Sequence, residues 1–262
     1  MSTADDHISQ IATPPANSDD PATGLCERSA ILIGDAGCER LARAQVLVAG
    51  LGGVGGHAAE ALARAGIGRL TLVDGDRVAP SNLNRQLVAL HSTLGQSKVA
   101  VMAARLGDIN PKCQIERLER FVAVDDIAGL ALGRFDAVVD AIDSLSTKVA
   151  LLAACLEAGV PVFSSMGAGS RLDPGAIRIS DLMHSQQCPL ARAVRQQLRR
   201  LGHGKGVLAV WSQETAHPPL MPAPGAGGHA INGTISYMPA LFGLTLAGCA
   251  IRRLLEETAP PE

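Results

Sequence analysis

The fold is decided by Gly50-Leu-Gly-Gly-Val-Gly-Gly56, a glycine-rich loop between two regular segments. The apolar stretch Gln45–Ala49 before it predicts a strand, and the Ala-rich stretch Val54–Ala65 after it predicts a helix. The loop fits the pattern G-x-G-x-x-G, in which glycines let the backbone pass close to phosphate oxygens. The following helix offers free N–H groups and positive potential at its N-terminus. The stretch therefore predicts a nucleotide site.

Strand-like and helix-like segments continue to alternate along the chain. Further strands are predicted at 69–74, 136–140, 161–164 and 176–179, and further helices at 96–106, 147–158 and 239–257. Continuous apolar strands joined by helices predict a buried, mostly parallel sheet with helices on both faces. We expect a Rossmann-like, doubly wound α/β fold with its ligand beyond the carboxyl ends of the strands.

Composition changes divide the chain into a tail and one domain. Residues 1–24 are rich in Asp, Ser, Pro and Ala without periodicity, which predicts a disordered N-terminal tail. Residues 25–262 are expected to form a single domain, with a core at about 25–165 and a C-terminal extension at about 166–262. Within the extension, the Pro- and Gly-rich residues 212–233 predict a mobile loop.

Charge and cysteine usage limit the classes of protein to consider. A net charge of −2 argues against a dedicated, highly basic nucleic-acid binder. Six cysteines lie far apart without a C-x-x-C pair, and the polar first residues are unlike a secretory signal, so we expect a cytoplasmic protein with free thiols. The apolar run 235–251 is short for a membrane span and predicts a buried helix, with membrane contact as the alternative.

Polar residues downstream of the glycine loop indicate that the nucleotide's phosphates take part in a reaction. Asp74 ends the second predicted strand, where it can accept hydrogen bonds from ribose hydroxyls. Arg85 and Lys98 can stabilise phosphate charge in nucleotidyl transfer, which a dinucleotide dehydrogenase does not require. Asn82 and Asn84 can orient phosphate oxygens as neutral donors. From composition alone, it is equally consistent that Arg85 and Lys98 are solvated surface charges.

A pair of acidic residues follows another predicted strand, in Asp140-Ala-Ile-Asp143-Ser144. A carboxylate that faces a triphosphate is suited to hold Mg²⁺, which bridges phosphate oxygens. Asp140 can instead be structural, by capping the helix that follows. We therefore favour Asp143 as the metal ligand.

The order and spacing of these motifs resemble the ubiquitin-activating-like (HesA/MoeB/ThiF) adenylating superfamily. The resemblance covers about residues 25–165 and implies a homodimer in which Arg28 of one subunit reaches the site of its partner. It implies catalytic roles for Arg85, Lys98, Asp143 and Arg28, and ATP with Mg²⁺ as the bound groups. The predicted nucleotide-binding residues are Gly50, Gly52, Gly53, Gly55, Asp74, Asp76, Ser81, Asn82, Asn84, Arg85, Gln86, Lys98, Asp143 and Ser144.

The second half of the chain narrows the resemblance. It lacks the two C-x-x-C zinc knuckles usual in activators of sulfur carriers. Instead, it is similar to the tRNA threonylcarbamoyladenosine dehydratases in Asp181-Leu-Met-His, Cys188-Pro-Leu-Ala, Trp211-Ser-Gln-Glu and Asn232–Gly243. That resemblance implies ATP-dependent cyclisation of the threonylcarbamoyl group on the adenosine beside the anticodon of tRNA, through an acyl-adenylate.

A basic stripe in the second half is the predicted contact with tRNA. Arg192, Arg195 and Arg199 recur at helical spacing, so their side chains share one face of a predicted helix. The functional interpretation is contact with tRNA phosphates, and the alternative is a solvated helix face.

Two other functions stay open at the level of sequence. One is adenylation of the C-terminus of a ubiquitin-like sulfur-carrier protein. The other is an NAD-binding dehydrogenase or a nucleotide-sensing protein, because G-x-G-x-x-G alone does not separate NAD from ATP. A protein of a sulfurtransferase system is a further candidate partner.

Overall fold

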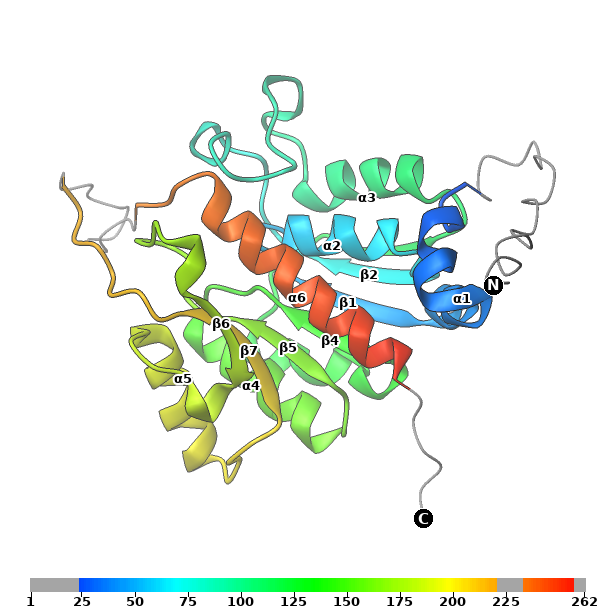
Figure 1. Cartoon of the computed structure of the whole chain (residues 1–262). Coiled ribbons are helices and arrows are strands. Elements are labelled where there is room, and N and C mark those ends of the chain that lie inside the picture. The colour runs from blue at the N-terminus through cyan, green and yellow to red at the C-terminus, as the bar shows by residue number, and fades with distance from the viewer. Residues whose placement is uncertain (1–23, 221–232, 257–262) are drawn as a thin grey trace, which may run out of the picture.

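Within residues 24–220 and 233–256, which the computed structural model describes, seven strands form one sheet in the order β3-β2-β1-β4-β5-β7-β6 (Figure 1). All neighbours are parallel except β6, which runs antiparallel to β7. The strands are β1 Gln45–Ala49, β2 Arg69–Val73, β3 Gln114–Leu118, β4 Ala137–Asp140, β5 Val162–Ser165, β6 Ile177–Asp181 and β7 Val207–Ser212. The predicted doubly wound α/β fold is confirmed.

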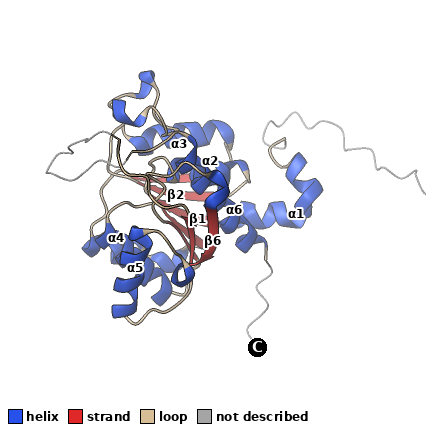
Figure 2. Cartoon of the chain, turned by 60° about the vertical axis from the view of Figure 1, so that its left-hand side comes forward, coloured by secondary structure: helices blue, strands red, loops and turns tan. Residues whose placement is uncertain are grey.

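Helices cover both faces of this sheet. Helices α2, α3 and α6 lie on one face together with α1, and α4 and α5 lie on the other (Figures 1 and 2). The α-helices are α1 Glu27–Arg43, α2 Gly55–Arg64, α3 Lys98–Ile109, α4 Leu145–Glu157, α5 Pro189–Arg200 and α6 Tyr237–Leu255. The short 3₁₀ helices are η1 Pro80–Asn82, η2 His91–Thr93, η3 Val124–Leu130, η4 Leu132–Arg134, η5 Pro174–Ala176 and η6 Leu182–His184.

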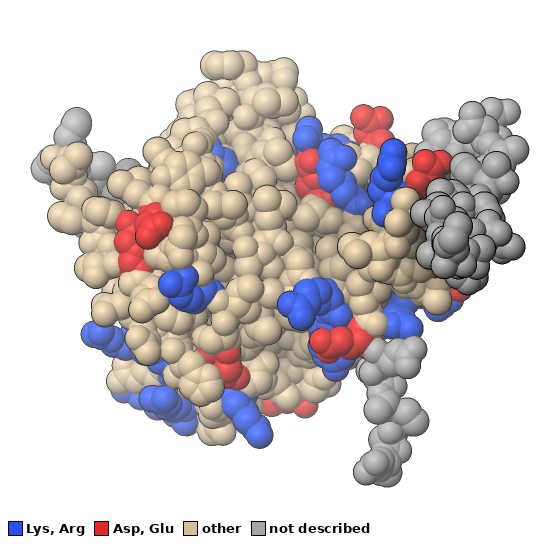
Figure 3. Space-filling model, viewed as in Figure 1, with Lys and Arg blue, Asp and Glu red and all other residues tan. Residues whose placement is uncertain are grey.

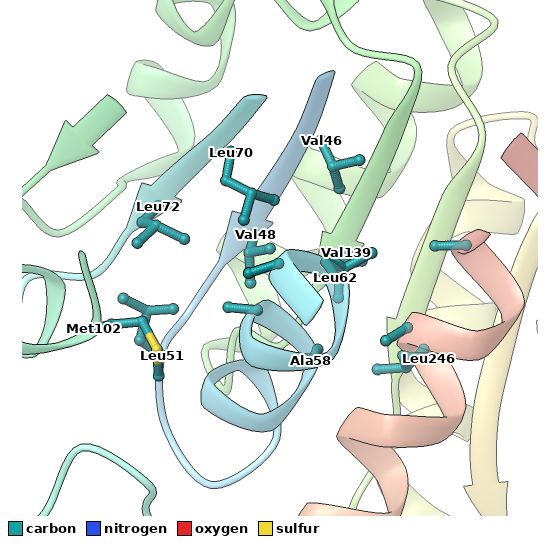
Figure 4. Close-up of a cluster of buried hydrophobic side chains, with 14 of the residues drawn as sticks. Val46, Val48, Leu51, Ala58, Leu62, Leu70, Leu72, Met102, Val139 and Leu246 are labelled. Atoms are coloured by element: carbon teal, nitrogen blue, oxygen red, sulfur yellow. The ribbon is translucent and has the colours of Figure 1, made fainter. Parts of the chain in front are cut away.

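The sheet separates two hydrophobic cores because successive side chains of a strand point to opposite faces. On β1, Val46 and Val48 pack with residues of α2, α3 and α6, as Figure 4 shows, whereas Leu47 and Ala49 pack with residues of α4 and α5. Apolar residues on both faces explain the continuous hydrophobic strands of the sequence. Carboxyl ends of β2, β1 and β4 meet at one edge, where the strand order reverses around β1.

Helix α6 accounts for the long apolar run near the C-terminus. By length and composition it is the one helix in the described residues that could cross a membrane. Met238, Phe242 and Leu246 of α6 are fully buried in the core shared with α2 and the sheet. The apolar face that these three residues form therefore serves the core, as predicted for a buried helix, while Leu244 is 49% exposed on the outer face. Contact of its outer face with a membrane stays a prediction.

Some predicted boundaries change by a few residues, and some elements are additional. The structure adds α1, β3 and β7 to the elements expected from sequence. Since β7 ends at Ser212, the predicted loop 212–233 begins inside a strand, which corrects that boundary. Residues 221–232 of this loop and residues 1–23 of the predicted tail lie outside the described residues.

Candidate nucleotide-binding site

The glycine loop connects β1 to α2 at the edge where the sheet order reverses. Gly50 has a φ of +88°, and a Cβ atom placed on it would lie 2.7 Å from the carbonyl oxygen of Ala141. A Cβ on Gly55 would lie 1.7 Å from the carbonyl oxygen of Gly50. Any side chain at these two positions would therefore clash with backbone, so the tight loop requires glycine.

Asp74, at the end of β2, holds the glycine loop in place. Its Oδ2 accepts a hydrogen bond from the backbone N–H of Leu51 at 2.6 Å, and its Oδ1 accepts one from the N–H of Asp76 at 2.7 Å. Each carboxylate oxygen has a second lone pair, so Asp74 can still accept a hydrogen bond from a ligand. The predicted contact with ribose hydroxyls is compatible with this geometry.

Lys98 begins α3 and is held by an ion pair. Its Nζ lies 2.8 Å from Oδ2 of Asp76, and the Lys98 side chain is only 5% exposed, against 52% for Asp76. Ser97 caps the helix, since its Oγ accepts the N–H of Ala100 at 3.3 Å. The ammonium group is therefore fixed before any ligand binds, which lowers the cost of organising the site.

The turn at 81–86 presents Arg85. Its Nη1 donates to the carbonyl of Ser81 and to Oδ1 of Asn84, both at 2.8 Å. Asn84 also donates through Nδ2 to the carbonyl of Thr234 at 2.8 Å, and Oδ1 of Asn82 accepts the N–H of Ala79 at 3.0 Å. Both asparagines thus shape the turn that orients Arg85, a role that spacing in the sequence does not reveal.

Next to this turn, Gln86 is buried and its Oε1 has no hydrogen-bond partner in the structure. A buried polar atom without a partner is costly, and a ligand can remove that cost by donating a hydrogen bond. Because Gln86 lines the pocket described below, its side chain is a candidate contact for a bound nucleotide.

Asp140 and Asp143 have different environments. Asp140 is fully buried, where its Oδ2 accepts hydrogen bonds from Lys148 Nζ and from Ser164 Oγ at 2.5 Å. Its Oδ1 accepts the N–H of Ile142 at 3.1 Å. Asp140 is therefore structural, although it acts through a buried ion pair rather than a helix cap. Asp143 is exposed and free to face a ligand.

One cavity of about 440 Å³ collects most of the predicted nucleotide-binding residues. It is lined by Gly50, Gly52, Gly53, Asp74, Asp76, Asn82, Arg85, Gln86, Lys98, Asp143 and Ser144. Gly55, Ser81 and Asn84 lie behind this lining and support it through the contacts given above. Sequence analysis missed other lining residues, namely Val54, Val73, Gly75, Arg120, Phe121, Val122, Thr147, Ala168, Thr234 and Pro239.

A larger cavity of about 800 Å³ lies at the opposite edge of the sheet. Its lining includes Ala44, Asp136 and Pro161, which directly precede β1, β4 and β5. Ligands of doubly wound sheets bind at the carboxyl ends of the strands. Size therefore does not identify the nucleotide site, and the smaller cavity, which has the glycine loop and the cations, is the candidate.

Comparison with known proteins agrees with this geometry. The family model of the ThiF family matches residues 26–262. The chain belongs to the ThiF family. It is 44% identical to the tRNA threonylcarbamoyladenosine dehydratase of Bacillus subtilis over 188 residues, which are 72% of this chain and 74% of that protein. The predicted resemblance to this superfamily is confirmed.

Solved structures of a second ThiF-family relative match almost the whole chain. The tRNA N6-threonylcarbamoyladenosine dehydratase of Escherichia coli in complex with AMP has a TM-score of 0.79 and 37% identity, covering 87% of this chain and 92% of that one. The complex of the same enzyme with ATP has a TM-score of 0.79 and 36% identity, covering 89% and 93%. The pocket described here therefore belongs to a fold that binds AMP and ATP in this relative.

Two groups of arginines with predicted roles lie on helices outside the pocket: Arg28, expected to reach a partner subunit, and the arginines of α5, expected to contact tRNA. Arg28 is exposed on α1 and is not among the residues that line the pocket of its own chain. Arg192 and Arg199 are exposed on α5, a helix over which basic side chains gather at the lower left of Figure 3. Arg195 is half-buried and donates to the backbone carbonyl of Ser185 at 2.8 Å and to its hydroxyl.

Burial lowers the pKa of Arg195, and the neighbouring charges of Arg199 and Arg192 lower it further. Its hydrogen bonds to Ser185 already use one nitrogen of the guanidinium. The three arginines are therefore not equivalent. Arg192 and Arg199 present their charge to solvent, and Arg195 anchors α5 to the segment before it.

Proposed function

We propose that this chain catalyses the ATP-dependent dehydration of threonylcarbamoyladenosine beside the anticodon of tRNA. One observation carries the proposal: the glycine loop, the cations Arg85 and Lys98 and the exposed carboxylate of Asp143 line a single pocket. Two relatives, which are 44% and 36% identical over 72% and 89% of this chain, are tRNA threonylcarbamoyladenosine dehydratases, and the second was solved with ATP. An adenylating enzyme needs this combination, because it must bind phosphates and stabilise charge that develops on them.

The chemistry has two steps. A carboxylate oxygen of the threonylcarbamoyl group attacks the α-phosphorus of ATP, forms an acyl-adenylate and releases pyrophosphate. The carbamoyl group of the same side chain then attacks the acyl carbon, closes a ring and expels AMP. The carboxylate oxygen leaves with AMP and the attacking carbamoyl group loses one proton; counted from the neutral carboxylic acid, the nucleoside loses one water. Because the attack is intramolecular, effective molarities of about 10⁵–10⁸ M are accessible and no covalent relay is needed.

The side chains of the pocket have distinct roles in these steps. Arg85 and Lys98 stabilise negative charge on the phosphates as the first bond forms. Asp74 receives the ribose hydroxyls, and the amide of Gln86 supplies a further polar contact. The backbone N–H groups at the start of α2 complete the phosphate cradle.

The oxygen ligands available in the pocket fit a magnesium ion that is bound mainly by the phosphates of the nucleotide. In the described residues, no group of three or more His, Cys, Asp or Glu side chains is placed to cage a metal. Mg²⁺ is usually bound through one or two carboxylates together with substrate phosphates, which is what Asp143 in this pocket can provide. When bound there, Mg²⁺ supplies neutralisation of phosphate charge.

A homodimer completes this proposed site. Ile31 and Leu32 on α1 are 80% and 87% exposed, which is unusual for two adjacent large apolar residues. Arg28 lies one turn before them on the same helix. We propose that this part of α1 packs on a second copy of the chain and carries Arg28 to the partner's phosphates.

Two exposed arginines of α5 are proposed to contact tRNA phosphates. Replacing Arg192 and Arg199 together by glutamine is expected to raise the KM for tRNA and to reduce the slope of log binding constant against log salt by about 2, because each phosphate contact contributes about one unit. The measurement is tRNA binding at several salt concentrations. The control replaces two exposed arginines far from α5, Arg64 and Arg117. An unchanged slope in the α5 variant would show that this face of α5 is solvated and does not contact tRNA.

Mass analysis of the tRNA nucleosides tests the proposed function. Incubation of tRNA bearing threonylcarbamoyladenosine with the protein, ATP and Mg²⁺ is expected to convert that nucleoside to a product lighter by one water, with AMP and pyrophosphate formed in equal amounts. ATP–pyrophosphate exchange that requires a small carrier protein instead of tRNA would favour activation of a sulfur carrier. Tight NAD binding without any exchange would contradict both adenylation functions.

Cellular placement and further partners stay predictions. All six cysteines are free in the structure, as a reducing cytoplasm would leave them. A partner from a sulfurtransferase system stays a prediction that a pull-down with the purified chain can test.

A further inference from the structure

The phenylalanines of this chain have unequal environments. The chain has four, and Phe135, Phe163 and Phe242 are at most 4% exposed. Phe121 is 72% exposed and lines the nucleotide pocket. Exposing an aromatic ring forfeits the stabilisation that its burial would give. An exposed ring on the wall of a binding pocket is therefore a candidate contact for a flat ligand.

The backbone around Phe121 fixes where its ring lies. Phe121 follows β3, whose last residue Leu118 is paired with Val73, the last residue of β2. A Cβ on Gly75 would lie 2.5 Å from the backbone nitrogen of Phe121 and 2.6 Å from its Cγ. The ring thus packs directly on the backbone just after Asp74, and only glycine leaves room for it.

The order of the strands places the parts of a nucleotide in sequence along the sheet edge. The glycine loop after β1 is the phosphate end, and Asp74 after β2 is the ribose position. The next strand in the sheet is β3, and Phe121 follows it. Since phosphate, ribose and base follow one another in a nucleotide, the base extends toward β3.

We propose that the ring of Phe121 stacks on the adenine base of the bound nucleotide. This inference rests on the proposed use of ATP and names the side chain that holds its base. Stacking of a base on an aromatic side chain is worth about 5- to 100-fold in affinity. Phe121 follows β3 and the glycine loop follows β1, so in this arrangement Phe121 contributes to binding of the base and leaves the chemical step to Arg85 and Lys98.

Base-dependent binding tests the inference. Affinities of AMP and ribose 5-phosphate are measured by competition against a fluorescent AMP analogue, for the wild type, Phe121→Ala, Phe121→Trp and Val124→Ala. Val124 is an exposed apolar residue close in sequence that does not line the pocket, so it is the matched control. Thermal unfolding of each variant checks that it is folded.

The wild type is expected to bind AMP more tightly than ribose 5-phosphate. Phe121→Ala is expected to weaken AMP binding by about 5- to 100-fold and to change ribose 5-phosphate binding less than 2-fold. Phe121→Trp is expected to restore AMP affinity, and Val124→Ala to leave both affinities unchanged. In turnover, Phe121→Ala should raise the KM for ATP and leave kcat within about 2-fold, because uniform binding is lost.

Two results would overturn the stacking contact. One is an unchanged AMP affinity in Phe121→Ala, and the other is an equal loss for AMP and ribose 5-phosphate, which would indicate a distorted pocket. If the wild type binds AMP and the variant gives either of these results, only the stacking contact is contradicted. A wild-type protein that binds neither ATP nor AMP contradicts the proposed function itself, and the stacking contact with it.

Discussion

Replacing Arg85 with alanine is expected to lower kcat/KM for adenylation by about 10²- to 10³-fold. The guanidinium is held by Ser81 and Asn84 on the wall of the pocket, where it can meet the phosphate charge that grows as pyrophosphate leaves. The measurement is tRNA-dependent ATP–pyrophosphate exchange together with AMP release. Since the lost stabilisation belongs to the transition state, kcat should fall with kcat/KM.

The matched control for Arg85 is Arg77. It is exposed where Arg85 is half-buried, and like Arg85 it donates from Nη1 to a backbone carbonyl, that of Gly95 at 2.8 Å, but it does not line the pocket. Arg77→Ala is expected to keep exchange within about 2-fold, because it removes a surface charge without a role in the transition state. Near-normal turnover of Arg85→Ala would show that Arg85 has no catalytic role. An equal loss in both variants would point to a general effect of charge.

Replacing Lys148 with methionine is expected to lower the free energy of unfolding by about 3–5 kcal/mol. Lys148 and Asp140 are both 0% exposed, and Lys148 Nζ also donates to the carbonyl of Ser165 at 3.0 Å. Without the ammonium, the Asp140 carboxylate stays buried with no cation to compensate it. Such a loss is a large part of the 5–15 kcal/mol that stabilises a typical domain. Urea unfolding followed by circular dichroism measures it.

The double variant Lys148→Met/Asp140→Asn separates the ion pair from packing. Removing both charges is expected to cost less than the sum of the two single changes, because neither partner is left charged and alone. Lys205→Met is the control for loss of a lysine charge, since Lys205 is exposed, and its effect should stay within about 0.5 kcal/mol. If Lys148→Met loses less than about 1 kcal/mol, the buried pair is not what stabilises this end of β4.

The sequence alone predicted the elements whose patterns are strongest. The strand at Gln45–Ala49 and the glycine loop were recognisable because both sides of that strand are apolar and the loop needs glycine for close backbone contacts. In contrast, β3 is an edge strand with the mixed sequence Gln114-Ile-Glu-Arg-Leu and no fully buried residue, so its pattern is weak. Helix α1 was missed because Gly34, with a φ of +70°, interrupts its regular spacing.

The phosphate side of the site was predictable and the base side was not. The motifs that follow the glycine loop predicted that Arg85 and Lys98 lie at the site, and both line the pocket, although composition alone fits a solvated surface charge equally well. Phe121 carries no motif, and its place in the pocket depends on how β3 pairs with β2. The role of Lys148 was hidden for a related reason: a lysine in the first turn of a helix looks exposed until the fold brings it onto Asp140.

The crossover from β5 to β7 has a consequence for how this architecture diversifies. These two strands are parallel neighbours, yet the chain between them contains β6 and α5. This connection starts at the carboxyl end of β5, beside the pocket, adds β6 at the outer edge of the sheet and returns through α5 to the start of β7. It can therefore lengthen or change in sequence while β1, β2 and β4 keep their register. Related proteins can in this way come to adenylate different substrates while the nucleotide site stays the same.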